Sequence, residues 1–470
     1  MLKHLRIRNF KGWKDTGDIV MAPITLFFGT NSSGKSSIGQ FLMMLKQTAE
    51  SSDRRAVFFP GDENSAVQLG SFQQMVFSRD VSNKIFFQYK WDCTNKIEFS
   101  DPISQSSYSG KFMVFESEVS LSSKNQTNLI VEQIKYELLN DSDQHILSIS
   151  MDRKNDKYKV KSDTYKLTRK LGRAWPLGSP LRFYGFPDEV VAYHQNADFV
   201  KDLNFRQEIL FRSIFYLGPL RTKTARLYSW NGIEPDSVGY AGQNTVAALL
   251  SAQDRKIGIK KGNNNKASPS QLFEAVIARS LQNMGLINDF KVDRLHEQRD
   301  EYEVKVQVGH SNTWVDLPDV GFGISQVLPV LVECYYAPAG SIIIMEQPEI
   351  HLHPSAQSAL ADVLIDVVQS RENGKDRKIQ LIIETHSEHF LRRLQRRIAE
   401  GVIPLEHVSA YSASVTDSSS QLTPLDIDAY GNIRNWPPNF FGNEMEDITR
   451  QADAAMERRK TERSMARGDA

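Results

Sequence analysis

The stretch Gly29-Thr-Asn-Ser-Ser-Gly-Lys35-Ser36 decides how the rest of the chain is interpreted. It fits the pattern G-x-x-x-x-G-K-[S/T] of a phosphate-binding loop. Residues 24–28 before it are apolar and favour a strand, and residues 37–50 after it place apolar side chains on one face of a helix. Because the pattern needs a strand, a loop and a helix in this order, the stretch predicts a nucleoside triphosphate site.

The residue types of this loop match what a triphosphate requires. Glycine lets the backbone curl so that its N–H groups surround the phosphates at the positive end of the helix dipole. Lys35 is expected to face solvent and to pair with the β- and γ-phosphates, and Ser36 is expected to hold Mg²⁺. The predicted nucleotide ligands of the loop are Gly29, Thr30, Asn31, Ser32, Ser33, Gly34, Lys35, Ser36 and Ser37.

The composition indicates an ordinary globular protein. The chain has 470 residues, with 57 Lys and Arg against 57 Asp and Glu, so its formal net charge is +0. Contact with nucleic acid would therefore need a local basic patch. Cys93 and Cys334 lie far apart, which argues against a disulfide framework. No apolar run approaches the ~20 residues of a membrane span and no signal peptide is evident, so we expect a cytoplasmic protein.

The length predicts more than one structural unit. Residues 1–75 are expected to form an N-terminal lobe with the phosphate-binding loop. Residues 76–212 contain short β-type runs separated by turn-rich segments, which predicts an inserted β-rich lobe. Residues 213–425 alternate between strand-like and helix-like patterns, which predicts a parallel sheet. Residues 426–470 are expected to be a small C-terminal module with a charged tail.

Polar residues that follow apolar runs in the last third of the chain are expected to complete the site. Residues 342–345 are apolar and Glu346 follows them, the Walker B arrangement of a strand-end carboxylate that lies beside the loop and holds Mg²⁺. Residues 379–383 predict another strand, which ends in a polar tip where His386 would reach the γ-phosphate. The segment Gly321-Phe-Gly323-Ile-Ser325-Gln326 opens a helix, and the N–H groups of a helix start suit an anion.

The order and content of these groups resemble the head of the ABC-type ATPases. In particular, they are similar to the branch of SMC, RecF and overcoming-lysogenisation-defect (OLD) ATPases of bacterial genome maintenance and phage defence. The strings Glu346-Gln-Pro-Glu-Ile-His-Leu-His-Pro354 and Glu384-Thr-His-Ser387 carry the resemblance most specifically. It spans residues 1–75 and 213–441.

The resemblance implies an α/β fold, an ABC-type P-loop ATPase head with a mixed or parallel sheet and helices, here carrying the β-rich lobe. It implies ATP and Mg²⁺ as ligands. Gly323, Ser325 and Gln326 look like the signature segment of that branch, which would contact the nucleotide of a second chain. The protein would then assemble around ATP as a homodimer or a higher homo-oligomer.

One departure from the family pattern concerns the attacking water. Alignment on Pro348 puts Glu346 at the metal-binding position and Gln347 where the usual head has a glutamate that activates water. An amide cannot accept a proton, but Gln can orient water. Glu349 is the other candidate, so slow or partner-gated hydrolysis is expected. The predicted catalytic residues are Glu349, Gln347 and His386, and the predicted metal ligands are Ser36 and Glu346.

Several other polar residues have both a structural and a functional interpretation. His351 and His353 lie near acids, but no third ligand is evident, so a turn before Pro354 is favoured over a metal site. A basic block on an expected helix is interpreted as a solvated face in preference to a DNA or partner site, and it comprises Arg392, Arg393, Arg396 and Arg397. Phosphate contact and surface ion pairing are equally open for Arg221 and Arg226. The candidates for the glutamine loop of ABC heads are Gln73 and Gln74.

Three functions from different classes follow from these patterns. The first is an ATP-switched assembly that gates a separate effector, nuclease or toxin, as the resemblance implies for defence ATPases. The second is a RecF-like or SMC-like DNA repair ATPase that clamps DNA. The third, the nucleotide-binding subunit of a transporter, is disfavoured because the β-rich lobe and the His-Leu-His-Pro string do not belong to such heads. The net charge of +0 favours the first over the second.

Overall fold

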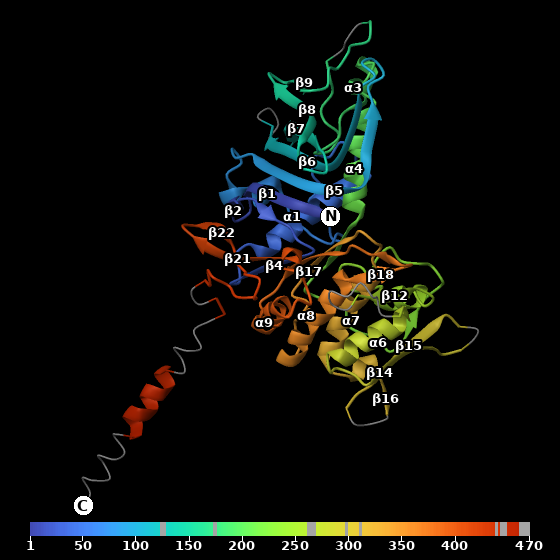
Figure 1. Cartoon of the computed structure of the whole chain (residues 1–470), viewed down its shortest axis with the longest axis vertical. Helices are drawn as coiled ribbons and strands as arrows, with labels where there is room; N and C mark the ends of the chain where they lie inside the picture. Colours follow the sequence, from blue (N-terminus) through green and yellow to red (C-terminus); the bar gives the residue numbers. More distant parts are fainter. Residues whose placement is uncertain are drawn as a thin grey trace, which may run out of the picture.

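The structure is a computed structural model, and it describes residues 1–122, 128–172, 176–260, 269–296, 299–309, 313–437, 440–441 and 449–459. Two large sheets face each other across one helix, and a set of helices covers the far side of the second sheet (Figure 1). The first sheet is antiparallel and the second is mainly parallel.

The antiparallel sheet has the strand order β2-β1-β5-β6-β7-β8-β9, with β3 paired to β1. Its strands alternate buried and exposed side chains, as expected for a sheet with one face on a core. The first three strands of the chain therefore share a sheet with the segment that the sequence assigns to an inserted lobe. The strands are β1 (Leu2–Phe10), β2 (Trp13–Asp15), β3 (Ile19–Val20), β5 (Ile85–Ser100), β6 (Ser107–Leu121), β7 (Leu129–Leu139), β8 (His145–Lys154) and β9 (Lys157–Ser162).

The second, central sheet has the order β10-β17-β20-β4-β21-β22. All neighbours are parallel except β22, which pairs antiparallel with β21. Parallel strands end at one edge of a sheet, so the loops that follow them gather there. The strands are β10 (Ile214–Leu217), β17 (Ile342–Glu346), β20 (Gln380–Glu384), β4 (Ile24–Gly29), β21 (Val408–Thr416) and β22 (Ser419–Pro424). The predicted α/β class with a parallel sheet is confirmed.

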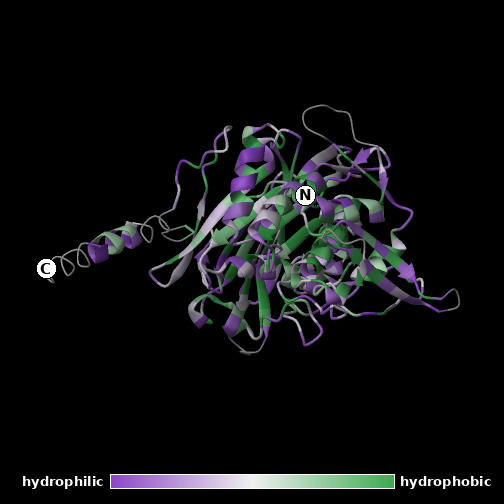
Figure 2. Ribbon diagram, turned by 90° about the horizontal axis from the view of Figure 1, so that it is seen from below, coloured by the Kyte–Doolittle hydropathy of each residue, from purple (hydrophilic) through white to green (hydrophobic). Residues whose placement is uncertain are grey.

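Helix α1 (Lys35–Glu50) joins the two sheets through its packing. The ring of Phe41 lies against Phe10 of β1 and Phe87 of β5, with ring centroids 4.9 and 5.1 Å apart. Gly39 on another face approaches Ile344 of β17. In Figure 2 the hydrophobic residues gather inside the molecule and the hydrophilic residues lie toward the outside. The helix that carries the phosphate-binding loop is therefore fixed from both sides.

The opposite face of the central sheet is covered by α7, α8 and α9, which belong to a second apolar core. Helices α5 and α6 pack beside α7, and α4 packs on α1. The remaining helices are α2 (Phe72–Met75), α3 (Asp188–Tyr193), α4 (Phe199–Arg212), α5 (Thr245–Ser251), α6 (Phe273–Asn283), α7 (Phe322–Tyr336), α8 (Pro354–Val368) and α9 (Glu388–Ala399).

Short strands and 3₁₀ turns complete the described part of the chain. One small sheet has the order β11-β15-β14 with β16 on β15, and another has the order β13-β12-β18-β19. The short strands are β11 (Tyr228–Ser229), β12 (Lys256–Ile259), β13 (Gln271–Leu272), β14 (Asp289–Arg294), β15 (Glu301–Gln307), β16 (Trp314–Asp316), β18 (Ser370–Glu372) and β19 (Lys375–Asp376). The 3₁₀ turns are Phe77–Arg79, Leu317–Asp319 and Leu405–His407.

Some local expectations from the sequence are corrected. The sequence of residues 270–285 predicts a helix with Ser270 as its N-cap and Gly285 just after its end. In the structure Gln271–Leu272 pairs with β12 and the cap is Leu272. Gly285 does follow the end of that helix, with φ of 69°. The composition of residues 262–269 predicts a loop, and most of them lie outside the described residues. Within the described residues, no helix is both long and apolar enough to cross a membrane.

Candidate nucleotide-binding site

The phosphate-binding loop connects the buried strand β4 to α1. Gly29 has φ of 137°, and a Cβ there would lie 2.1 Å from the carbonyl oxygen of Ala413 on β21. Gly34 has φ of 93°. Both positions therefore require glycine. Helix α1 begins at Lys35 without a side-chain cap, and the N–H of Ser37 already donates to the carbonyl oxygen of Gly34 at 3.1 Å. The N–H groups of Lys35 and Ser36 at the helix start are therefore the ones that suit an anion.

Lys35 is held inside this loop. Its side chain is nearly buried, and its Nζ donates hydrogen bonds to the carbonyl oxygens of Gly29 at 3.0 Å and Thr30 at 2.7 Å. The expectation that Lys35 faces solvent is wrong, because the loop closes over the ammonium group. Burial lowers the pKa of Lys35, and the nearby Glu384 carboxylate opposes that effect. The loop is thus organised around the charge that would meet a phosphate.

Two carboxylates end neighbouring strands at this edge of the sheet. Glu346 on β17 is in register with Glu384 on β20, and Glu384 is in register with Phe27 on β4. Because β20 lies between β17 and β4, Glu384 and not Glu346 stands beside Lys35, with Oε1 3.9 Å from Nζ. Glu346 accepts a hydrogen bond of 2.7 Å from the hydroxyl of Tyr216 on β10.

The donor set of this edge fits a magnesium ion. Burial raises the pKa of Glu346 to about 7, and burial also raises the pKa of Glu384. One oxygen of Glu384, Oε2, is buried without a hydrogen-bond partner, while a hydrogen bond from Ser36 lowers the pKa of the same carboxyl. A divalent cation would stabilise the ionised carboxylates, and oxygen ligands are those that Mg²⁺ prefers. Ser36, Glu346 and Glu384 would hold it.

Gln347 and Glu349 lie at different depths. Gln347 has a left-handed backbone, with φ of 47°, and lines the cavity above the loop. Glu349 is buried, and its Oε1 accepts hydrogen bonds from the hydroxyl of Thr385 at 2.7 Å and from the backbone N–H of His386 at 2.8 Å. Burial raises the pKa of Glu349. Of the two, Gln347 lines the cavity, and Glu349 supports the turn that carries His386.

A cavity of about 370 Å³ opens between the loop and the ends of β17 and β20. His386 is exposed at its rim, and burial of the ring nitrogens and the charge of Lys35 lower its pKa. Ser33 does not line the cavity, since its side chain is turned inward toward Lys35. The cavity is lined by Lys11, Gly12, Asn31, Ser32, Gly34, Lys35, Ser36, Ser37, Gln347, Glu384, His386 and Ser420.

The comparison with known families places most of the chain in one family of ATPase domains. The model of the AAA ATPase domain family matches residues 1–204 and 247–391, and these segments contain the loop, both strand-end carboxylates and His386. The chain belongs to this family. A second model, described as a protein of unknown function (DUF3696), matches residues 406–451, which include β21 and β22. Among the curated proteins, none matches the chain.

The structural neighbours of the chain include three heads of SMC proteins. The SMC head domain from Thermotoga maritima has 11% identity and a TM-score of 0.39, and the match covers 91% of this chain and 99% of that chain. An SMC head bound to the C-winged helix domain of ScpA has 10% identity and a TM-score of 0.40, with 91% of this chain and 98% of that chain covered. An SMC head with an extended coiled coil, bound to the C-terminal domain of ScpA derived from Pyrococcus furiosus, has 10% identity and a TM-score of 0.38, with 90% of this chain and 96% of that chain covered. At these scores the likeness carries no argument about function.

The predicted signature residues lie away from the cavity of this ATPase domain. Ser325 is in the first turn of α7, where its hydroxyl donates to the carbonyl oxygen of Phe322 at 2.8 Å. Ser325 lines a separate small pocket together with Thr222 and Lys223. Gly323 packs against the carbonyl of His351, so a Cβ at this position would lie only 3.2 Å from that oxygen. Within one chain the structure does not bring Gly323, Ser325 and Gln326 to the loop.

Arg221 connects the two regions. Its side chain is buried, and its guanidinium donates to the carbonyl oxygen of Gln326 at 3.0 Å and lies 3.4 Å from the carbonyl of Glu346 and 3.5 Å from that of Gln347. Burial lowers the pKa of Arg221 to about 10, and Glu349 opposes that effect. The sequence left phosphate contact and surface ion pairing equally open for Arg221. The structure supports neither, because the guanidinium donates to backbone carbonyls of α7 and of the end of β17.

Several residues of the site escaped the sequence interpretation. Glu384 follows three apolar residues and Glu346 follows four, so the same strand-plus-acid signal marked both. Trp13 donates from its indole nitrogen to the carbonyl of Gly34 at 3.1 Å and to the hydroxyl of Ser37 at 2.8 Å. No local pattern marks Trp13, Lys11, Tyr216 or Ser420, because their role depends on which strands become neighbours.

The contacts of the histidines and arginines that had both a structural and a functional interpretation show how these side chains are used. His353 caps α8 and bonds to Ser355, and no cluster of three or more metal-ligating His, Cys, Asp or Glu side chains occurs within the described residues. Arg226 pairs with Asp316 and Asp319 on the surface. The basic block of α9 is paired with acids: Arg393 and Arg397 with Asp362, Arg396 and Arg397 with Glu400, and Arg392 with Glu388.

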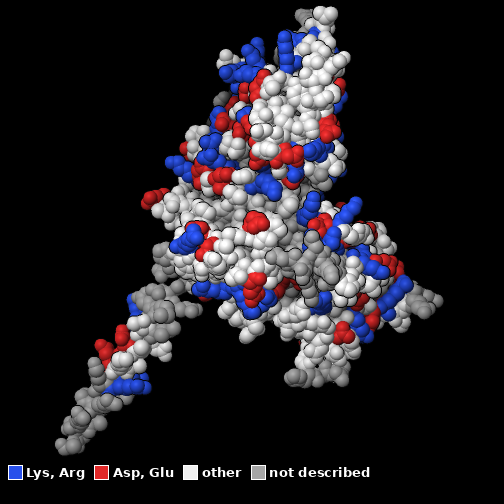
Figure 3. All heavy atoms as spheres, in the orientation of Figure 1, with Lys and Arg blue, Asp and Glu red and all other residues white. Residues whose placement is uncertain are grey.

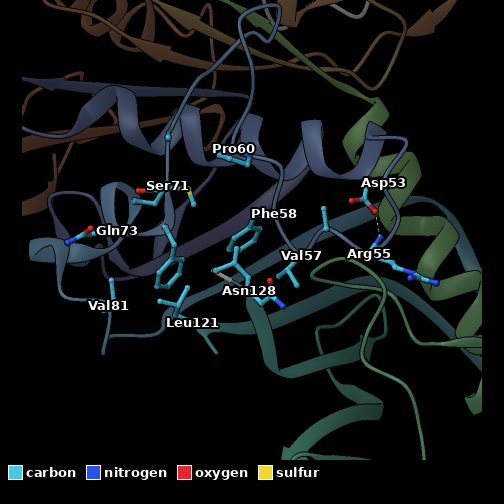
Figure 4. A pocket seen from close by; sticks show the side chains of 15 residues that line it. Asp53, Arg55, Val57, Phe58, Pro60, Ser71, Gln73, Val81, Leu121 and Asn128 are labelled. Carbon is cyan, nitrogen blue, oxygen red and sulfur yellow. Dashed lines mark hydrogen bonds between the residues drawn. The ribbon is translucent and has the colours of Figure 1, made fainter. Parts of the chain in front are cut away.

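A larger cavity, of about 860 Å³, lies away from the loop (Figure 4). Phe58, Val57 and Leu121 line its floor and Asp53 and Arg55 its rim, between the segment after α1 and the ends of β6 and β7. Gln73 lines this cavity. Gln74 instead accepts from the backbone N–H of Ser71 in a capping box at 2.8 Å. Neither glutamine lines the cavity above the phosphate-binding loop.

Proposed function

We propose that this protein binds ATP with Mg²⁺ in the cavity above the phosphate-binding loop and hydrolyses it slowly. One observation carries the proposal: Lys35, Ser36, Glu384, Gln347 and His386 come from separate segments and line one cavity of about 370 Å³. The volume falls within the range of small-molecule sites. The open N–H groups of α1 and the buried charge of Lys35 suit the phosphates.

In the proposed reaction a water oxygen bonds to the γ-phosphorus, its proton passes to a γ-phosphate oxygen, and the bond to the β–γ bridging oxygen breaks to leave ADP. Gln347 orients this water from the cavity wall, and His386 contacts the γ-phosphate. Glu349 positions His386 through its hydrogen bond to the backbone N–H. When bound, Mg²⁺ neutralises charge on the phosphate oxygens. Phosphoryl transfer depends mainly on such positioning, so an enzyme without a glutamate base remains active.

The proposed active assembly contains two chains. Ser325 lines a pocket apart from the loop of its own chain, and the exposed ring of Phe322 stands at the same helix start. A second chain, facing the first, would bring this helix start to the γ-phosphate. Contacts that need the γ-phosphate are lost on hydrolysis, so the assembly is a switch biased by the nucleotide.

The proposed biological role is to gate a separate effector or nuclease in anti-phage defence, in the cytoplasm. The formal net charge is +0, and positive and negative side chains are interspersed on the face seen in Figure 3. A repair ATPase that clamps DNA needs a broad positive surface. Purification together with the products of neighbouring genes, followed by mass spectrometry and nucleic-acid analysis, separates the two roles: a co-purifying effector supports gating, and co-purifying DNA supports the repair alternative.

Nucleotide binding and hydrolysis test the core of the proposal. The wild-type protein should bind a fluorescent ATP analogue and release phosphate only with Mg²⁺. Lys35→Ala should abolish both, because the ammonium group is lost from the loop. Lys46→Ala, on the same helix but paired with Glu50, is the matched control and should behave as wild type. Equal ATP affinity in Lys35→Ala and wild type would contradict the assignment.

A further inference from the structure

The C-terminal strand pair β21–β22 is built into the nucleotide site. Strand β21 runs parallel to β4 with Ala413 beside Gly29, and β22 turns back along β21 toward β2 (Figure 1). Phe440 and Phe441, further along the chain, lie against the ring of Phe28, with centroids 5.6 and 6.0 Å away. The family model that covers this region describes it as of unknown function.

Ser420 of β22 reaches the glycines on both sides of the cavity. Its backbone N–H donates to the carbonyl of Gly12 at 2.7 Å. Its Oγ would lie 2.6 Å from a Cβ at Gly12 and 2.8 Å from a Cβ at Gly34. Since neither glycine has a side chain, the hydroxyl occupies the space between the turn after β1 and the phosphate-binding loop.

Ser420 also lines the cavity above the phosphate-binding loop. The side chain of Ser420 is 5% exposed, and that remaining surface contributes to the wall that includes Gly34, Lys35 and Ser36. The next residue, Gln421, points away from the core and is exposed, as expected for alternate positions of a strand. A ligand that contacts Gly34 and the first turn of α1 therefore lies beside Ser420.

We propose that Ser420 is a nucleotide-contacting residue and that the C-terminal strand pair forms one wall of the nucleotide site. The inference rests on the proposed function and deepens it. The ligand is a nucleoside triphosphate or diphosphate, and the serine hydroxyl hydrogen-bonds to one of its phosphate or ribose oxygens. The segment described as of unknown function thereby contributes directly to ligand binding, and bound nucleotide stabilises its position beside the loop.

Nucleotide protection of an introduced thiol tests this contact without measuring activity. The native thiols are buried, Cys93 at 5% exposure and Cys334 at 0%, so they give little background. In the full chain, Ser420→Cys is treated with methyl methanethiosulfonate, a small reagent that enters the cavity. Saturating ADP or a slowly hydrolysed ATP analogue should slow its modification at least about tenfold. Gln421→Cys, one residue away on the outer face, should react at the same rate with and without nucleotide.

Two further variants make the result decisive. Lys35→Ala combined with Ser420→Cys should lose the protection, because the nucleotide no longer binds. Ser420→Ala should weaken binding of the fluorescent nucleotide about three- to tenfold, as expected for one lost hydrogen bond. Ser420→Ala also serves if the cysteine variant does not fold, since alanine removes one atom only.

The outcomes separate the two proposals. Unchanged thiol reactivity, or unchanged affinity of Ser420→Ala, in a protein whose wild type binds nucleotide overturns the Ser420 contact and leaves the ATPase proposal standing. Absence of nucleotide binding by the wild type overturns the proposed function itself, and the contact with it. Protection that is present in Ser420→Cys and absent in Gln421→Cys supports the inference.

Discussion

Gln347 and Glu349 are only two residues apart, but their side chains lie in different environments. A left-handed backbone at Gln347 turns its amide into the cavity, whereas Glu349 is buried beneath the turn of Thr385 and His386. The attacking water of the proposed reaction would meet the amide first. Glu349 would act through His386, as a positioning residue.

This difference predicts distinct effects of substitution. Gln347→Ala should leave nucleotide affinity unchanged and lower kcat at least about tenfold, because water loses its orienting group. Glu349→Gln keeps an acceptor for Thr385 and His386, so kcat should fall less, whereas Glu349→Ala should slow turnover and destabilise the fold. Phosphate release and thermal unfolding measure both quantities. A Gln347→Ala enzyme with wild-type kcat would contradict the assignment.

At the scale of elements, one side chain links the first turn of α7 to the end of β17 beside the cavity. Arg221 follows β10, and its guanidinium contacts carbonyls from the first turn of α7 and from the end of β17. Displacement of α7 by a partner chain would therefore reach the segment that carries Gln347. The fork of an arginine makes these contacts at once, and a lysine cannot.

The prediction for Arg221→Lys is a turnover defect with intact binding. Nucleotide affinity should stay within about twofold of wild type, and kcat should fall about tenfold, since the tether between α7 and Gln347 is lost. Arg226→Lys, an exposed arginine of the same segment that pairs with Asp316 and Asp319, is the control and should have no effect. Steady-state kinetics with parallel binding titrations provide the measurement, and equal kcat values for the two variants would refute the tether.

Helix α7 also contains a buried carboxyl that links its packing to pH. Glu333 accepts a hydrogen bond of 2.9 Å from the backbone N–H of Val238, and its other oxygen has no partner. Burial raises the pKa of Glu333 from 4.5 to about 7. Between these values the unfolded chain is ionised while the folded chain keeps the proton. Stability from this group is therefore present below pH 4.5 and is lost as the pH rises toward 7.

Glu333→Gln should remove this pH dependence. The amide is neutral at every pH and its oxygen can accept from Val238. The variant should match wild type near pH 4.5 and exceed it at pH 8 by roughly 3 kcal/mol, the free energy of the pKa difference. Urea unfolding at both pH values measures the difference, with the exposed Glu406→Gln as control. A variant whose stability relative to wild type is the same at both pH values would show that Glu333 does not titrate in this range.

At the scale of the whole molecule, α1 is fixed between the two sheets, and the cavity opens at the edge where β17, β20 and β4 end. The helix start of α7 lies outside that cavity, and its Phe322 ring is 70% exposed. The exposed ring gives this helix start an apolar side chain that a partner surface could cover. In the proposed assembly a second copy of the chain covers it.

The assembly predicts ATP-dependent association. With ATP present and hydrolysis slowed by Gln347→Ala, sedimentation should show dimers or larger species. Ser325→Arg should abolish association and turnover while one chain still binds ATP. Because Ser325 is buried, Phe322→Glu provides a second test on the exposed surface. Ile103→Glu, at an exposed position in the turn between β5 and β6, is the control. Unchanged association of both α7 variants would rule out this interface.

The sequence by itself determined the features that depend on neighbours along the chain. The strand, glycine-rich loop and helix around Lys35 are local, as are the apolar runs that end at Glu346 and Glu384, so the α/β class and the nucleotide site could be predicted. Periodicity also indicated the antiparallel strands β5 to β9. Such patterns report which face of an element is buried, but not what lies against it.

Only the tertiary structure decided which carboxylate stands beside the loop and which residue of the C-terminal strand pair packs against it. The order β17-β20-β4-β21 puts Glu384 next to Lys35 and brings Ser420 to Gly12 and Gly34. It also folds the loop over Lys35, which the motif alone had left facing solvent. Strand order and register arise from packing between segments hundreds of residues apart, and no local pattern encodes that packing.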